Sequence, residues 1–108
     1  FGDLLMQELL EYMQLADRII SEHGFFYIVD DLSHFGTAAP DVRRKVASWL
    51  ATAPCRGVVV YGGSLAARAM FTLIMGAMKL MGNLKFPAAL VRNEKEARAF
   101  VAAHCTPA

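Results

Sequence analysis

Arg56–Ser64 has the sequence R-G-V-V-V-Y-G-G-S, in which a short apolar run ends at two glycines and a serine. The run is typical of a buried strand, and Ser64 is a residue type that commonly caps the start of a helix. A similar run, Phe25–Asp31, precedes it and another, Phe86–Val91, follows it, each trailed by a helical pattern. Strands that alternate with helices favour a parallel sheet covered by helices. The sequence therefore predicts an α/β fold with a mixed, mainly parallel sheet and helices on its faces.

Length and composition predict a single domain over residues 1–108. The chain is 56% hydrophobic and has a net charge of +1 from 11 basic and 10 acidic residues, without the basic surface that binds nucleic acid. Its longest apolar stretch, Ala69–Met78, is about half of the roughly 20 residues that span a membrane. Cys55 and Cys105 lack the spacing of a metal site or disulfide framework. We expect a cytoplasmic domain with reduced thiols and no cofactor, metal ion, nucleic-acid partner or membrane span.

Capping residues predict where the helices begin and end. Asp3 is expected to cap a first helix that stops at Gly24, and Asn93 with Glu96 forms a capping-box-like pair that opens the last helix. After a loop at Leu32–Ala39, Pro40 fits the first turn of a second helix, whose buried face includes Trp49. Three strands make a small sheet, and the chain enters a helix almost at once. We therefore expect that upstream strands of the parent protein are missing from this chain.

Two strand–helix junctions carry polar residues from which a site could be built. They are Asp31, Ser33 and His34 after the first predicted strand, and Gly62, Gly63 and Ser64 after the second. Ligands of parallel sheets gather at the carboxyl ends of the strands. Backbone N–H groups at a glycine turn that opens a helix favour a small anion, although a tight turn with a serine cap is the simpler interpretation. Asp31, His34 and Ser64 are also candidates for acid–base chemistry in a small enzyme, but such residues are common in turns and caps.

The third predicted helix, from Ser64 to about Met81, contains four of the six methionines. A helical wheel places its core face at Ala66, Met70, Leu73, Ile74, Ala77 and Met81. Arg68, Thr72 and Lys79 form a narrow outer stripe. Phe71, Met75 and Met78 then lie beside this stripe, where solvent is expected. Apolar residues at such a place bind a partner, a second copy of the chain or an apolar ligand. Contact with a neighbouring helix is the alternative.

Several short motifs carry a family resemblance. They are D-L-S at Asp31–Ser33, P-x-x-R-R at Pro40–Arg44 with the nearby Trp49, V-Y-G-G-S at Val60–Ser64, and N-E-K-E-A-R-A-F at Asn93–Phe100. Together with the order of helices and strands, they resemble the STAS domain, the fold of bacterial anti-sigma factor antagonists. The match is closest to an uncharacterised STAS-like branch of proteobacterial proteins, and it covers essentially the whole chain.

The resemblance implies a non-enzymatic regulatory or protein-interaction module. STAS domains normally begin with a strand pair before the first helix, which agrees with the expected missing strands. In the antagonists, a kinase phosphorylates a serine or threonine in a D-S-[ST]-G-like turn. The hydroxyls in that neighbourhood here are Ser33 and Thr37, without the Ser-Gly pairing. The wider superfamily includes lipid-carrying CRAL-TRIO domains, so binding of an apolar ligand beside the third helix is a second expectation, and a small enzyme is a third.

Overall fold

The computed structural model describes the backbone of residues 2–105 and the side chains of residues 4–33 and 38–104. The helices in this part are α1 (Met6–His23), α2 (Pro40–Thr52), α3 (Leu65–Leu80) and α4 (Glu94–Phe100), which continues into a π-helical turn at Val101–Cys105. The strands are β1 (Gly2–Leu4), β2 (Phe26–Asp31), β3 (Phe35–Ala38), β4 (Cys55–Tyr61) and β5 (Ala88–Val91). The predicted α/β class is confirmed.

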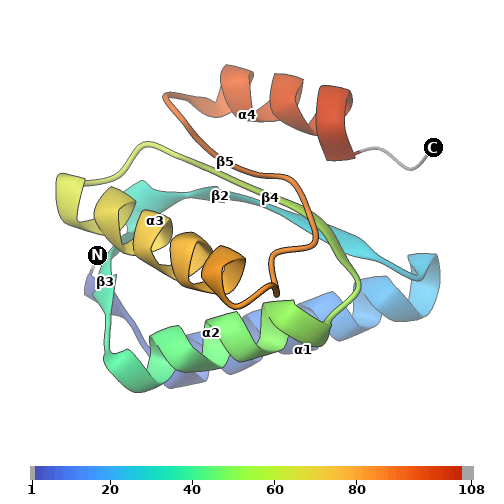
Figure 1. Cartoon of the computed structure of the whole chain (residues 1–108), viewed down its shortest axis with the longest axis horizontal. Coiled ribbons are helices and arrows are strands. Elements are labelled where there is room, and N and C mark those ends of the chain that lie inside the picture. The colour runs from blue at the N-terminus through green and yellow to red at the C-terminus, as the bar shows by residue number, and fades with distance from the viewer. Residues whose placement is uncertain (1, 106–108) are drawn as a thin grey trace.

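Three of the strands form a parallel sheet in the order β2-β4-β5, which puts β2 at one edge. The register pairs Asp31 with Tyr61 and Tyr61 with Val91. All three strands therefore end together, as expected for the carboxyl edge of a parallel sheet. Helices cover both faces: α4 lies on one side, whereas α1, α2 and α3 lie on the other (Figure 1).

The predicted start of the chain and the first predicted loop are wrong in part. Leu32–Ala39 contains a 3-10 turn and β3, and β3 pairs in parallel with β1. Asp3 thus lies within a strand, and the cap position of the first helix is Leu5. The first helix begins after Leu5, whose backbone N–H donates to Glu8 Oε1 at 3.0 Å. Strands of three and four residues are too short for alternation to reveal them in a sequence.

The other predicted helix ends are confirmed. Gly24 ends α1 in the left-handed conformation, with φ at 84°. Ser64 Oγ accepts a hydrogen bond from the Ala67 backbone N–H at 3.1 Å, and Asn93 Oδ1 accepts one from that of Glu96 at 2.9 Å. These side chains satisfy backbone donors that a helix leaves without a partner in its first turn.

Trp49 links the two parts of the hydrophobic core. It packs against the main cluster, where its ring stacks on that of Phe26 with centroids 5.4 Å apart and planes 10° apart. It also packs against a smaller cluster of Leu9, Ala38 and Val42. The predicted inward orientation of Trp49 on α2 is confirmed.

The face of α3 predicted to be buried is wrong in part, because Met70 and Ile74 are half-buried but the other four of its six residues are exposed. The buried residues of α3 are Ala67, Phe71, Met75 and Met78, which are 0%, 9%, 8% and 2% exposed. Leu73 and Met81, expected in the core, are 62% and 73% exposed. Apolar residues occupy nearly the whole circumference of this helix, so periodicity alone does not identify the face that packs on the sheet.

Candidate functional site

The two predicted strand–helix junctions lie against each other. Gly62 and Gly63 have φ angles of 66° and 84°, a conformation that favours glycine. A Cβ on Gly63 would lie 2.5 Å from the Cβ of Leu32, and one on Gly62 would lie 3.0 Å from Asp31 Oδ1. The two loops therefore form one continuous corner at the carboxyl edge of the sheet, as the sequence predicts. We call Asp31–Ser33 together with Gly62–Ser64 the strand-end corner.

Polar side chains of the strand-end corner stabilise its own turns. Asp31 Oδ1 accepts a hydrogen bond from the Ser33 backbone N–H at 2.9 Å, and Ser64 Oγ caps α3. These are the turn and cap roles that the sequence offers as alternatives to catalysis. The side chains of His34 and Thr37 lie outside the described residues. Ser33 is exposed, and its phosphorylation stays a prediction.

Arg68 holds the ends of two strands together. Its Nη1 donates to the Gly62 carbonyl at 3.2 Å and to the Val91 carbonyl at 3.3 Å. The sequence places this residue in an exposed stripe, but it is half-buried. Its guanidinium satisfies carbonyls that lie where β4 and β5 end, so the turn after β4 is fixed from α3 as well as from Leu32.

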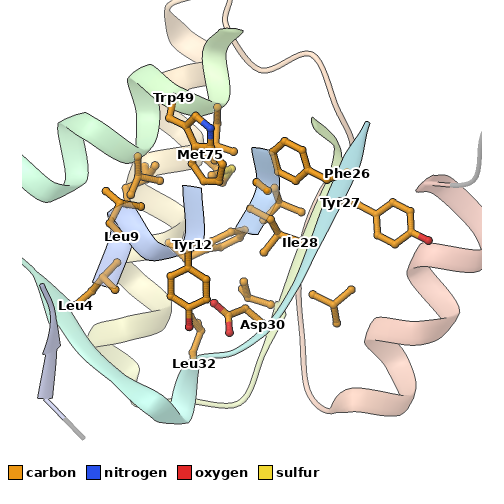
Figure 2. A pocket seen from close by; sticks show the side chains of 18 of the residues that line it. Leu4, Leu9, Tyr12, Phe26, Tyr27, Ile28, Asp30, Leu32, Trp49 and Met75 are labelled. Atoms are coloured by element: carbon orange, nitrogen blue, oxygen red, sulfur yellow. The ribbon is translucent and has the colours of Figure 1, made fainter. Parts of the chain in front are cut away.

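A cavity of about 300 Å³ lies between α1, α2, α3 and the sheet (Figure 2). Its walls are almost entirely apolar, with contributions from Leu9, Ile28, Trp49, Val60, Met70 and Met75. Ligand pockets in proteins begin at about this volume. It is twice the size of an engineered cavity of about 150 Å³ that stays dry and binds benzene. The cavity is therefore large enough for a small apolar ligand.

The cavity opens between α1 and β2. Two of its lining residues on α1 are exposed, Tyr12 by 44% and Leu15 by 46%, and Asp30 on β2 is half-buried. Within the described part of the chain, β2 is the edge of its sheet, so no strand lies beside it to close this side. The lining residues on α2, α3 and β4 form the inner walls. A ligand would enter past the edge of β2.

Two polar side chains lie together at this opening. The Tyr12 hydroxyl and the Asp30 carboxylate lie side by side, next to Leu32 (Figure 2). Burial raises the pKa of Tyr12, and the negative charges of Asp30 and Glu8 raise it further. Tyr12 is therefore a neutral phenol at neutral pH. Among the described residues that line the cavity, Asp30 is the only one with an acidic or basic side chain.

Sequence reasoning did not identify Tyr12 and Asp30 as a site, although both left a signal. Asp30 lies two residues after Ile28 and four after Phe26, so alternation puts a carboxylate on an otherwise apolar strand face. Tyr12 follows Leu9 by three residues and therefore borders the buried stripe of α1. What no pattern indicates is that the helices pack with a space between them.

The surface predicted for self-association is wrong. Phe71, Met75 and Met78 are buried against the sheet, and the first two line the cavity. The exposed apolar residues of α3 include Leu73 and Leu80, at 62% and 89% exposure. An apolar ligand expected beside the third helix would therefore lie against its inner face. Self-association itself stays a prediction.

Within the described residues, no three His, Cys, Asp or Glu side chains gather in a way that could hold a metal ion. No helix there combines the length and the hydropathy of a membrane-spanning segment. Comparisons of the chain with protein-family models, with curated proteins and with solved structures gave no match, so the resemblance to the STAS domain stays a prediction.

Proposed function

We propose that this domain is a non-enzymatic binding module that holds a single-chain apolar ligand in the cavity between α1, α2, α3 and the sheet. The observation that carries the proposal is the cavity itself, about 300 Å³ of apolar space open beside the edge of β2. Water in such a space finds few hydrogen-bond partners.

The size of the cavity limits the ligand. At about 30 Å³ for each heavy atom in a liquid, a volume of about 300 Å³ holds on the order of ten atoms. A single alkyl chain of about ten carbons would fill it, whereas a two-chain lipid would leave much of its hydrocarbon outside. The class of ligand is therefore a single-chain amphiphile with its head at the opening.

Trp49 provides the assay, because it is the only tryptophan of the chain and lines the cavity. Titration with 1-decanol should change its fluorescence saturably. Ala16→Leu adds bulk inside the cavity and should weaken binding, whereas Ala66→Leu makes the same change on the exposed face of α3 and should bind like the wild type. Circular dichroism checks that both variants fold. Absence of a saturable change, or equal binding by the Ala16→Leu variant, would contradict the proposal.

A second candidate function is regulatory protein interaction through the strand-end corner, the role that the family resemblance implies. The close contact between Gly63 and Leu32 and the two hydrogen bonds from Arg68 support it. A loop surface held by a rigid scaffold is a common place for binding. Amide chemical shifts of an isotope-labelled sample test it against fractions of a bacterial lysate and against nucleotides. Changes at Ser33 and Gly63 would support it, and changes confined to the opposite edge of the sheet would count against it.

A further inference from the structure

We infer that the outer face of α3 is a surface for self-association, on which a second copy of this chain packs its own α3 in the antiparallel direction. The opposite face of the helix points to the sheet and lines the cavity (Figure 1), so the inference goes beyond the proposed function. The outer face consists of the exposed residues of the helix, which are Leu65, Ala66, Ala69, Thr72, Leu73, Gly76, Ala77, Lys79 and Leu80.

The outer face is apolar over nearly half the circumference of the helix. Leu65, Leu73 and Leu80 are 85%, 62% and 89% exposed. At 3.6 residues per turn, the exposed residues cover an arc of about 160°. A surface helix normally presents charged and polar side chains on such an arc. A contiguous exposed apolar patch is instead typical of an interaction surface.

The order of residues along the outer face identifies the partner as a second copy. Leu65 and Leu80 lie at its two ends, Ala69 and Gly76 each lie four residues further in, and Leu73 lies next to the centre. The face therefore reads nearly the same from either end. A two-fold interface needs one patch that matches itself. In an antiparallel pair, Leu65 of each copy lies level with Leu80 of the other, and the small residues between them let the helices approach closely.

Charge favours the antiparallel direction over the parallel one. Lys79 is the one charged residue of the outer face, because Arg68 is half-buried and donates to carbonyls at the ends of β4 and β5. A parallel pair would bring the two Lys79 side chains together. In an antiparallel pair, each lies level with Ala66 of the other copy, about 20 Å along the helix from its counterpart at 1.5 Å per residue. That separation exceeds the screening length of about 8 Å at physiological salt.

The area of the outer face predicts a weak, reversible dimer. The helix has 16 residues and is therefore about 24 Å long. Nearly half the surface of a helix of that length and of about 10–12 Å diameter is on the order of 500 Å². Two copies would then bury about 1,000 Å², which is near the lower limit for a specific interface. We therefore expect dissociation in the high micromolar range.

Sedimentation velocity over a series of concentrations up to the millimolar range tests the inference. The sedimentation coefficient of the wild type should rise with concentration from the monomer value to the dimer value. Leu73→Glu puts a charge near the centre of the interface and should raise the dissociation constant by about tenfold or more. Leu10→Glu makes the same change at an exposed leucine of α1 and should stay within about twofold of the wild type. Circular dichroism checks that both variants fold.

Two further substitutions test the antiparallel direction, and they remain informative if Leu73→Glu does not fold. Leu65→Glu or Leu80→Lys alone should weaken the dimer. Together in one chain, they place each introduced carboxylate beside an introduced ammonium group of the other copy, so part of the affinity should return and be lost again at high salt. In a parallel dimer, the same double variant would bring like charges together.

Four results would overturn the inference. One is a wild type that stays monomeric at the highest concentration. Another is Leu73→Glu protein that dimerises like the wild type, which would put the interface elsewhere. The third is an equal loss of affinity in Leu10→Glu, which would show that added charge alone prevents association. The last is a double variant that dimerises more weakly than either single variant.

Discussion

Two methionines at the end of α3 give a matched test of which face of that helix is buried. Met78 is 2% exposed and Met81 is 73% exposed, whereas a helical wheel drawn from the sequence puts Met81 in the core and Met78 outside. Burying a methionine side chain is worth about 1.5–3 kcal/mol, and truncating a buried one costs about 2–5 kcal/mol once the cavity is included. Met78→Ala should therefore lower the free energy of unfolding by about 2–5 kcal/mol.

Met81→Ala makes the same chemical change, but it removes little buried apolar surface because Met81 is mostly exposed. About a quarter of the side chain is covered, so the expected loss is about a quarter of the transfer term, below about 1 kcal/mol. Urea denaturation followed by circular dichroism measures both values, provided that the slope with denaturant is unchanged. The assignment of the buried face would be refuted if Met81→Ala lost more stability than Met78→Ala, or if Met78→Ala stayed within about 0.5 kcal/mol of the wild type.

Three more predictions concern single side chains elsewhere. Trp49→Ala removes a residue that packs against both core clusters and should cost about 3 kcal/mol in urea denaturation; a loss below about 1 kcal/mol would contradict its structural role. Gly63→Ala should destabilise more than Gly24→Ala, because both glycines have φ at 84° but only the first would place a Cβ within 4 Å of other atoms; equal melting temperatures would contradict this packing. A side-chain hydrogen bond from Arg92 lowers the pKa of Glu96 below its ordinary 4.5. The stability that this pairing adds to the folded state is therefore fully present above pH 4.5 and is lost as the pH falls through the lower pKa of the folded protein. Melting temperatures of wild type and Glu96→Gln should therefore differ at neutral pH and converge in acid, and a constant difference would contradict the pairing.

The parts of the fold that the sequence predicts are those that depend on local chemistry. Val58, Val59 and Val60 form an uninterrupted apolar run, as a strand covered on both faces requires. Ser64 and Asn93 cap helices because their side chains reach backbone donors three residues on. The meeting of the two junctions follows from topology, because parallel strands in register must end at the same edge.

The parts that the sequence does not predict depend on how elements pack. Nothing local distinguishes the Met78 side of α3 from the Met81 side, because both sides are apolar and only the position of the sheet decides between them. The cavity is a property of three helices and a sheet together, so no single stretch carries its signal. Alternation along β2 predicts that Asp30 lies on the apolar face of this strand. Its proximity to Tyr12 cannot be predicted in this way, because it depends on how α1 lies against the strand.

Leu32 joins the two candidate sites, the cavity and the strand-end corner. It is buried, it lines the cavity, and it is the residue against which Gly63 packs. Asp30 at the opening and Asp31 in the strand-end corner precede it at the end of β2 and face opposite sides, as successive strand residues do. A ligand in the cavity would thus contact the same side chain that supports the Gly62–Gly63 turn. The two proposed functions, ligand binding and protein interaction, therefore share one side chain, Leu32.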